Sequence, residues 1–262
     1  MDFAQMAPRI CNCGDDSCTY SYVLITTLTL PIPSPFLQVA GQSSSGKSYF
    51  YFKLMRHLDH IVCGGDKENP DPDDPGGNEC PITQIIYCYA IWQPEFDKFV
   101  QKGVKFINGF NSPFLSEAYM NDNPNVLLLL DDVAYDAPKQ FLSNCFTKFS
   151  HHYKWSISFQ CHNIFSKEIS DARTTALNST YTILTSSRRC RDSAHNLGLQ
   201  VFRGDKDYLN VFKEIYNYMM TVEWGNILVD THPRQNDNRL TIRMNIFFPF
   251  DGDEPHAIFF PK

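Results

Sequence analysis

The chain has 262 residues, of which 43% are hydrophobic and 20% charged, and its formal net charge at pH 7 is −6. This composition excludes a mainly disordered chain, and the negative charge excludes a general attraction to nucleic acid, which depends on clustered Lys and Arg. No apolar run approaches the roughly 20 residues of a membrane-spanning helix, and the first residues lack the pattern of a signal peptide. We therefore expect one α/β domain that is not secreted and has no membrane partner.

The nine cysteines indicate reduced thiols rather than disulfides, since we expect no export. Cys88, Cys145 and Cys161 stand in apolar or mixed segments, and we interpret them as small hydrophobic residues of the core. Residues 11–18 hold the spacing C-x-C-x4-C without a second pair of ligands nearby. We favour a loose arm over a zinc site there.

Residues 1–35 are predicted to be an N-terminal extension of a domain that spans residues 36–262. Within the extension, residues 20–30 are rich in Thr, Val and Ile and predict an added edge strand. Three prolines separate this strand from the domain.

Residues 41–48, GQSSSGKS, fit the phosphate-binding pattern G-x-x-x-x-G-K-[ST] at every fixed position. A buried strand at 36–40 and a helix-compatible run at 49–58 supply the context that this motif requires, which disfavours a merely flexible loop. We expect Lys47 to reach the outer phosphates and the Ser48 hydroxyl to bind Mg²⁺. Backbone N–H groups at the helix N-terminus would bind the phosphates of ATP. The loop residues in this role are Gly41, Gln42, Ser43, Ser44, Ser45, Gly46, Lys47 and Ser48.

Beyond the loop, strands alternate with helices. Residues 63–81 are rich in Pro, Gly and Asp and predict an acidic surface loop. The predicted strands are 83–90, 126–130, 155–160, 181–184 and two more near 227–229 and 240–246. One predicted helix follows Pro94, and the other predicted helices span residues 138–149, 171–179 and 206–222. This order indicates a mainly parallel central sheet with helices on both faces and extra strands at the termini.

Two carboxylates follow the apolar strand in the sequence NVLLLLDD. Parallel sheets bind ligands at the carboxyl ends of their strands, where Asp131 and Asp132 would emerge. Because side chains alternate along a strand, we expect Asp131 to face Mg²⁺ and Asp132 to face the water that attacks the γ-phosphate. A solvated turn or a helix N-cap is the alternative, and the phosphate loop favours the catalytic interpretation.

The succession of strands resembles the additional-strand (ASCE) class of P-loop NTPases. In that class the strand after the acidic one lies centrally, and its tip senses the γ-phosphate. The candidate sensors are Gln160, His162 and Asn163, and turn capping is the alternative role for each of them.

From about residue 36 to residue 248 the chain resembles the FtsK/HerA-type genome-packaging ATPases of Polinton (Maverick) elements and related large-genome DNA viruses. The resemblance lies in the order of the segments GQSSSGKS, IIYCYAIWQ, FINGF, LLLLDDV, SHHYKWSISFQCHNIF, ARTTALNSTYTIL, RRCRDSAHNLGLQVF and ILVDTHPRQNDNRLTIRMNIF. Individually, only the phosphate loop is highly specific.

This resemblance implies an ATPase that forms a ring, expected to be hexameric, and hydrolyses ATP between neighbouring subunits. The ring would translocate double-stranded DNA into a preformed capsid without reading its sequence. ATP and Mg²⁺ are the implied cofactors, and capsid or portal-vertex proteins are the implied partners. The implied location is the virion or the interior of the host cell, in the nucleus or the cytoplasm.

Carried over by motif, Lys47 and Ser48 bind phosphate and Mg²⁺, Asp131 supports Mg²⁺, and Asp132 polarises water. Asp132 is shorter than the Glu that many relatives of the wider superfamily place there, which leaves its reach to the water open.

The sensor and the arginine are carried over in the same way. Asn163 matches the family's Q-N-[LI]-F segment, whereas His162 stands where Gln is usual, so Gln160 stays an alternative sensor. Arg173, in ARTTALN, matches a recurring Arg and is the candidate finger that reaches into the next subunit's site. Its alternative role is a surface salt bridge. Three other arginines could act as the finger instead: Arg188, Arg189 and Arg191.

Charge is unevenly distributed along the chain. Residues 147–191 hold seven basic residues against two acids, whereas residues 66–79 hold six acids and one lysine. In a motor, the basic segment could line the pore and grip DNA phosphates. A solvated basic face is the alternative.

Two other functions stay open. A small-molecule or nucleoside kinase would use the same phosphate loop, but the sequence holds no recognisable substrate lid or acceptor pocket. An NTP-binding regulatory or scaffold subunit with little turnover belongs to a different class.

Overall fold

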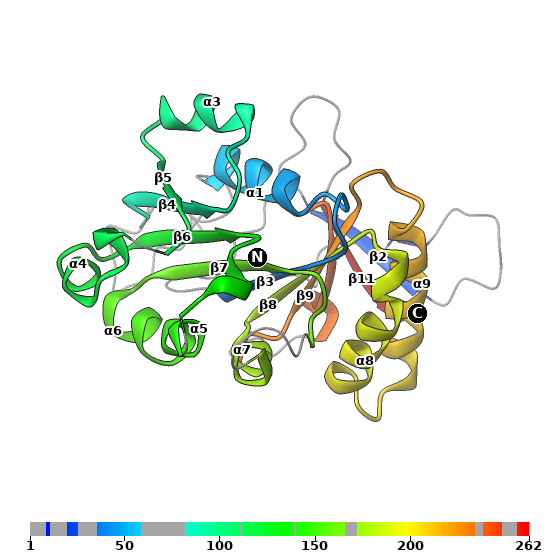
Figure 1. Ribbon diagram of the computed structural model, residues 1–262. Helices are drawn as coiled ribbons and strands as arrows, with labels where there is room; N and C mark the ends of the chain where they lie inside the picture. The colour runs from blue at the N-terminus through cyan, green and yellow to red at the C-terminus, as the bar shows by residue number, and fades with distance from the viewer. Residues whose placement is uncertain are drawn as a thin grey trace, which may run out of the picture.

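The computed structural model describes residues 9–10, 20–25, 36–58, 82–110, 112–138, 140–165, 172–233, 238–247 and 256–261. The predicted surface loop at 63–81 and the cysteine cluster at 11–18 lie outside these residues. In the described part of the chain, strands form one sheet in the order β1-β2-β11-β10-β9-β8-β3-β7-β6-β4-β5 (Figure 1). None of the helices described there is long and apolar enough to cross a membrane.

One half of the sheet is parallel. Its strands are β3 (Phe36–Ala40), β4 (Gln84–Tyr89), β5 (Lys105–Asn108), β6 (Val126–Asp131), β7 (Ser156–Cys161) and β8 (Tyr181–Thr185). The central strands are short and buried along their whole length, as helices on both faces require. β7 lies between the phosphate-loop strand β3 and the acidic strand β6. The predicted additional-strand order is therefore confirmed.

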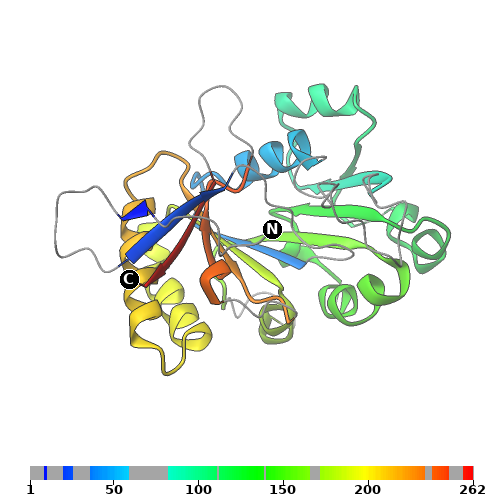
Figure 2. The same ribbon diagram turned by 180° about the vertical axis from the view of Figure 1, so that it is seen from behind.

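The other half of the sheet is antiparallel. Its strands are β9 (Asn226–Asp230), β10 (Ile242–Met244), β11 (His256–Pro261), β2 (Tyr20–Ile25) and β1 (Arg9–Ile10). The strand predicted within residues 20–30 is present over Tyr20–Ile25, and it pairs with β11, which the sequence pattern did not predict. Figure 2 shows β2 and β11 side by side at the edge of the sheet far from β5. A boundary at residue 35 remains a prediction.

Helices cover both faces of the sheet (Figure 1). On one face lie α1 (Lys47–Arg56) and α3 (Asp97–Val100), which follows the single turn Pro94–Phe96. The opposite face carries α4 (Glu117–Asp122), α5 (Phe141–Asn144), α6 (Ser150–Tyr153), α7 (Ala172–Asn178), α8 (Arg191–Val201) and α9 (Lys206–Met219). The helix predicted after Pro94 is thus short, α9 ends three residues before the predicted Val222, and α8 was not predicted.

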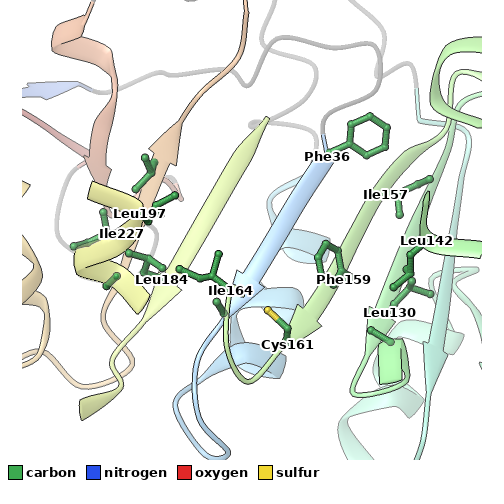
Figure 3. Close-up of a cluster of buried hydrophobic side chains, with 14 of the residues drawn as sticks. Phe36, Leu130, Leu142, Ile157, Phe159, Cys161, Ile164, Leu184, Leu197 and Ile227 are labelled. Atoms are coloured by element: carbon green, nitrogen blue, oxygen red, sulfur yellow. The ribbon is translucent and has the colours of Figure 1, made fainter. Parts of the chain in front are cut away.

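The sheet divides the core into two apolar clusters. The cluster on the α1 face contains Leu37, Val39, Phe50 and Leu129. Figure 3 shows the other cluster, in which Leu130, Phe159, Leu184 and Ile227 of four strands meet Leu142 of α5 and Leu197 of α8. Cys88, Cys145 and Cys161 belong to the second cluster as free buried thiols, which confirms their predicted place in the core.

The helix predicted at 138–149 is wrong in its limits. Gln140 has a left-handed backbone (φ 64°), so the helix cannot begin at Pro138 and starts at Phe141. It then passes through a π-helical turn, Cys145–Phe149, and ends at Tyr153, before Lys154 with its positive φ. The prediction failed because the residue types of Gln140 and Lys154 do not indicate a positive φ.

A buried ion pair joins two antiparallel strands next to the parallel half. The guanidinium of Arg243 in β10 donates to Oδ2 of Asp230 in β9, and its Nε donates to the Leu240 carbonyl oxygen at 2.6 Å. Both side chains are almost wholly buried. Burial lowers the pKa of Arg243, and the nearby Asp230 carboxylate opposes this effect. Each charge is therefore tolerated only in the presence of the other.

Asp230→Ala is expected to lower the free energy of unfolding by about 3–5 kcal/mol, because it leaves the Arg243 charge buried without its partner. The double variant Asp230→Leu, Arg243→Met should recover most of this loss. Urea unfolding of both variants measures the difference, and a loss below about 1 kcal/mol in the single variant would contradict the assignment.

Candidate triphosphate and magnesium site

The phosphate loop connects the carboxyl end of β3 to α1 and is braced by the neighbouring strands. The Gly41 N–H donates to the Cys161 carbonyl oxygen at 3.0 Å, and the Ser45 and Thr185 hydroxyl oxygens are 2.6 Å apart. A Cβ atom added to Gly41 would lie 1.9 Å from Thr185 Oγ1, so only glycine fits this position. The loop is thus held between β7 and β8 before any ligand binds.

The N-terminus of α1 is open to an anion. Gly46 precedes the helix with a φ of 92°, no side chain caps the helix, and its first turn holds no acidic residue. The N–H groups of this turn therefore keep the positive end of the helix dipole available. This is the arrangement that binds phosphate groups in proteins.

Lys47 is folded over the loop itself. Its Nζ donates to the carbonyl oxygens of Gly41 at 3.0 Å and Gln42 at 3.2 Å, and the residue is 5% exposed. The same Nζ lies 4.0 Å from Asp132 Oδ1. The ammonium group is thus buried beside the loop. When a nucleotide binds, its charged outer phosphates would replace the two neutral carbonyl oxygens as hydrogen-bond acceptors of the ammonium group.

Asp131 ends β6 beside the first turn of α1. Its Oδ1 accepts a hydrogen bond from the Ser48 hydroxyl at 3.1 Å, and its Oδ2 accepts one from the Tyr87 hydroxyl of β4. Burial raises the pKa of Asp131 to about 6, and the nearby Asp132 also raises it, whereas Tyr87, Ser48 and Lys47 lower it. A buried carboxylate next to a hydroxyl at a phosphate loop matches the oxygen ligands that Mg²⁺ prefers. Ser48 and Asp131 therefore fit the predicted metal site.

Asp132 lies just beyond the end of β6, so the expected alternation of its side chain with that of Asp131 stays a prediction. Its side chain is 50% exposed, in contrast to the buried Asp131, and its backbone is left-handed with a φ of 54°. Aspartate tolerates this conformation better than most residues, and such a φ often marks a functional position. The carboxylate of Asp132 thus faces solvent next to Lys47, where an attacking water could be polarised.

Gln160 lies on β7 on the same face of the sheet as α1. In the parallel register Val39 of β3 pairs with Gln160, and Val39 packs in the α1-face cluster. The residue is 0% exposed, and within the described part of the chain neither its Oε1 nor its Nε2 has a hydrogen-bond partner. An unpaired buried amide costs free energy, and a water or a ligand group that completed its hydrogen bonds would remove this cost.

The other two candidate sensors lie in the turn after β7. The Asn163 Oδ1 atom accepts hydrogen bonds from the Phe165 N–H at 3.0 Å and the Ser193 hydroxyl at 2.7 Å, so the amide oxygen caps the turn. The exposed His162 ring stacks on Tyr135, with centroids 5.4 Å apart. Of the three candidates, Gln160 alone is buried and lacks a partner.

The candidate arginines stand in two places. Arg173 belongs to α7, and its side chain lies outside what the structure describes. Arg188, Arg189 and Arg191 are exposed and follow β8, at the same edge of the sheet as the phosphate loop. Ser187, just before them, accepts a hydrogen bond from the Gln42 N–H at 3.3 Å. Among the described side chains, no hydrogen bond or ion pair joins an arginine to Lys47, Asp131 or Asp132.

Three residues of the site were not predicted: Tyr87, which donates to Asp131, and Thr185 and Ser187, which brace the loop. Each acts across neighbouring strands. The order of the strands in the sequence could have indicated which strands are neighbours in the sheet. It does not predict the register between them, which brings these hydroxyl groups into contact with their partners.

The pKa of Asp131 can be tested in the metal-free protein, where its carboxyl group should titrate near pH 6. Because this pKa is higher than the unfolded value of about 4, ionisation of Asp131 weakens the fold as the pH rises between the two. Tyr87→Phe removes a hydrogen bond to the carboxylate and should raise the pKa further. Asp132→Asn removes a repelling charge and should lower it.

The measurement is ¹³C NMR of the carboxyl carbons, with Asp131→Asn to assign the signal. Equal shifts in the same direction for both variants would refute this account of the electrostatics.

Gln160→Leu tests the buried amide. The substitution removes two unpaired polar atoms at similar volume, so the free energy of unfolding should stay equal or increase. If Gln160 is the expected sensor of a bound γ-phosphate, the substitution should slow ATP hydrolysis by about 100-fold, which is typical of losing one polar group that stabilises a transition state. Ser158→Ala, two residues earlier on the same face of β7, serves as the matched control and should retain activity. A fully active Gln160→Leu variant would exclude Gln160 as the sensor.

No protein-family model matches the sequence, and neither does any curated protein. Among solved structures, the chain is similar to the genome packaging NTPase B204 from Sulfolobus turreted icosahedral virus 2, at 13% identity. In its sulfate complex the TM-score is 0.49, with 82% of this chain and 96% of that chain covered. In its AMP complex the TM-score is 0.48, with 82% and 98% covered. At this level of identity and TM-score, the similarity does not by itself identify the chain.

Proposed function

We propose that this protein is an ATPase that packages double-stranded DNA of a virus or a transposon into a capsid. The observation that carries the enzymatic part is the convergence of the uncapped N-terminus of α1, the Ser48 and Asp131 pair and the unpaired Gln160 amide at one edge of the sheet. The packaging role rests on the ordered sequence segments that resemble the FtsK/HerA-type packaging ATPases.

In the proposed reaction, the loop N–H groups hold the phosphates of ATP, and Lys47 moves from the loop carbonyls to the outer phosphates. Ser48 and Asp131 hold Mg²⁺, which when bound neutralises charge on the phosphates. Asp132 accepts a hydrogen bond from the attacking water and orients it. The Gln160 amide lies where it can contact the γ-phosphate or that water, and the amide nitrogen of Asn163 is the alternative sensor.

The positive group that stabilises the transition state is proposed to come from a neighbouring subunit. The described contacts supply Lys47 as the cation of the site and no arginine. Phosphoryl transfer in P-loop NTPases commonly gains about 10³-fold or more from an arginine finger. Arg173 is the proposed finger, in a ring that we expect to be hexameric, and the cluster at Arg188 is the alternative.

DNA contact is proposed for the basic segment, but the structure divides that segment. Lys154 precedes β7 and lies at the amino edge of the parallel strands, whereas Arg188 follows β8 at the carboxyl edge. Both are exposed. The two residues therefore lie at opposite edges of the sheet, so a substitution at each tests a different edge for DNA contact.

The test is the rate of ATP hydrolysis with and without double-stranded DNA, beside the mass of the assembly in the presence of ATP. The wild type should form an oligomer whose hydrolysis DNA accelerates. Asp132→Asn should bind ATP with an affinity within about threefold of the wild type and hydrolyse it at least about 100-fold more slowly, as expected for loss of a general base.

Within the same assay, Lys154→Ala should reduce stimulation by DNA more than basal turnover, and an equal loss of both would count against DNA contact at that edge. A monomer that DNA does not stimulate would refute the motor. Transfer of phosphate to a small acceptor would favour a kinase, and an Asp132→Asn variant with unchanged biological function would favour a scaffold.

A further inference from the structure

Two exposed aromatic side chains lie against the phosphate loop. Trp224 is 46% exposed and Tyr49 is 37% exposed, and their ring centroids are 5.0 Å apart. Tyr49 is in the first turn of α1, directly after the metal-site residue Ser48. A Cβ atom built on Gly46 would lie 3.0 Å from Trp224 Cε3, so the indole packs directly on the loop. Exposed aromatic surface beside a candidate binding site often marks a contact with a ligand.

The turn that carries Trp224 is firmly held. Trp224 has a φ of 58°, which is unusual for a bulky residue. Its carbonyl oxygen accepts from Asn226 Nδ2 at 3.4 Å, and the Gly225 carbonyl oxygen accepts from the Ser186 N–H at 3.0 Å. The side chain donates from Nε1 to Glu223 at 2.9 Å. The strained backbone therefore places the indole in one position next to β8.

The order of the strands places the metal-site residue Asp131 and Trp224 on opposite sides of β3. Asp131, which marks the metal and the γ-phosphate, ends β6, two strands from β3 on one side. Trp224 precedes β9, two strands from β3 on the other side. A triphosphate with its outer phosphates toward Asp131 therefore extends its nucleoside toward Trp224.

We propose that Trp224 and Tyr49 form a stacking platform for the base of the bound nucleotide. This inference rests on the proposed triphosphate site. The platform offers ring faces to the base, and every base has a π-face, so stacking selects little between ATP and GTP. The base would add affinity that the phosphates alone do not supply.

The test compares binding of ATP and of inorganic tripolyphosphate, each with Mg²⁺, by calorimetry. Trp224→Ala should weaken ATP binding by about tenfold or more, the usual effect of losing one stacking partner, and leave tripolyphosphate binding unchanged. Trp224→Phe should recover most of the affinity, and Tyr49→Leu should weaken ATP binding in the same selective way. Trp92→Ala is the matched control, because Trp92 is 44% exposed and its described ring contacts are with Tyr89, Phe96 and Phe106, none of which is a residue of the site.

The two affinities distinguish the stacking platform from the triphosphate site. Unchanged ATP affinity in Trp224→Ala, or an equal loss for both ligands, would overturn the platform while the triphosphate site stands. A wild-type protein that binds neither ligand would overturn the proposed function and the platform together.

Discussion

The close contact between Gly41 and Thr185 is the constraint on which the site depends. The Thr185 hydroxyl lies within hydrogen-bond distance of both the Ser45 side chain and the Ala40 carbonyl oxygen, so hydrogen bonds join the ends of β3 and β8 to the phosphate loop. These bonds fix where α1 begins, and with it the positions of Lys47 and Ser48 relative to Asp131. A side chain at residue 41 would separate β8 from the loop and move all of these groups.

Several groups of the site are unfavourable in the free protein. The first turn of α1 is uncapped, the Gln160 amide is unpaired, and burial disfavours the charge on Asp131. The two apolar clusters on the faces of the sheet offset these costs. A ligand that satisfies the same groups would stabilise the fold when it binds. Locally unfavourable groups of this kind are typical of functional sites.

Much of the fold was predictable because the phosphate loop and the acidic strand use fixed residue types, and because the strand succession determines the sheet order around β3. Tyr87 and Thr185 could not be assigned, since their roles depend on the register between strands. Gln140 misled the helix prediction through its left-handed backbone, which depends on tertiary packing rather than residue type. Among the candidate sensors, the sequence did not separate Gln160 from His162 and Asn163, whereas burial and hydrogen bonding in the structure do. The role of Arg173 stays a prediction, because its side chain is not described.

The pairing of β2 with β11 joins residues near the two ends of the described chain, such as Tyr22 and Phe259. During synthesis β2 precedes β11 by more than 200 residues, and before residues 256–261 follow, its described pairing is the short one with β1. The parallel half, from β3 to β8, has by then all of its strands available. The antiparallel edge should therefore close last, and a newly made chain would expose the edge of β2 that pairs with β11 until residues 256–261 have been made.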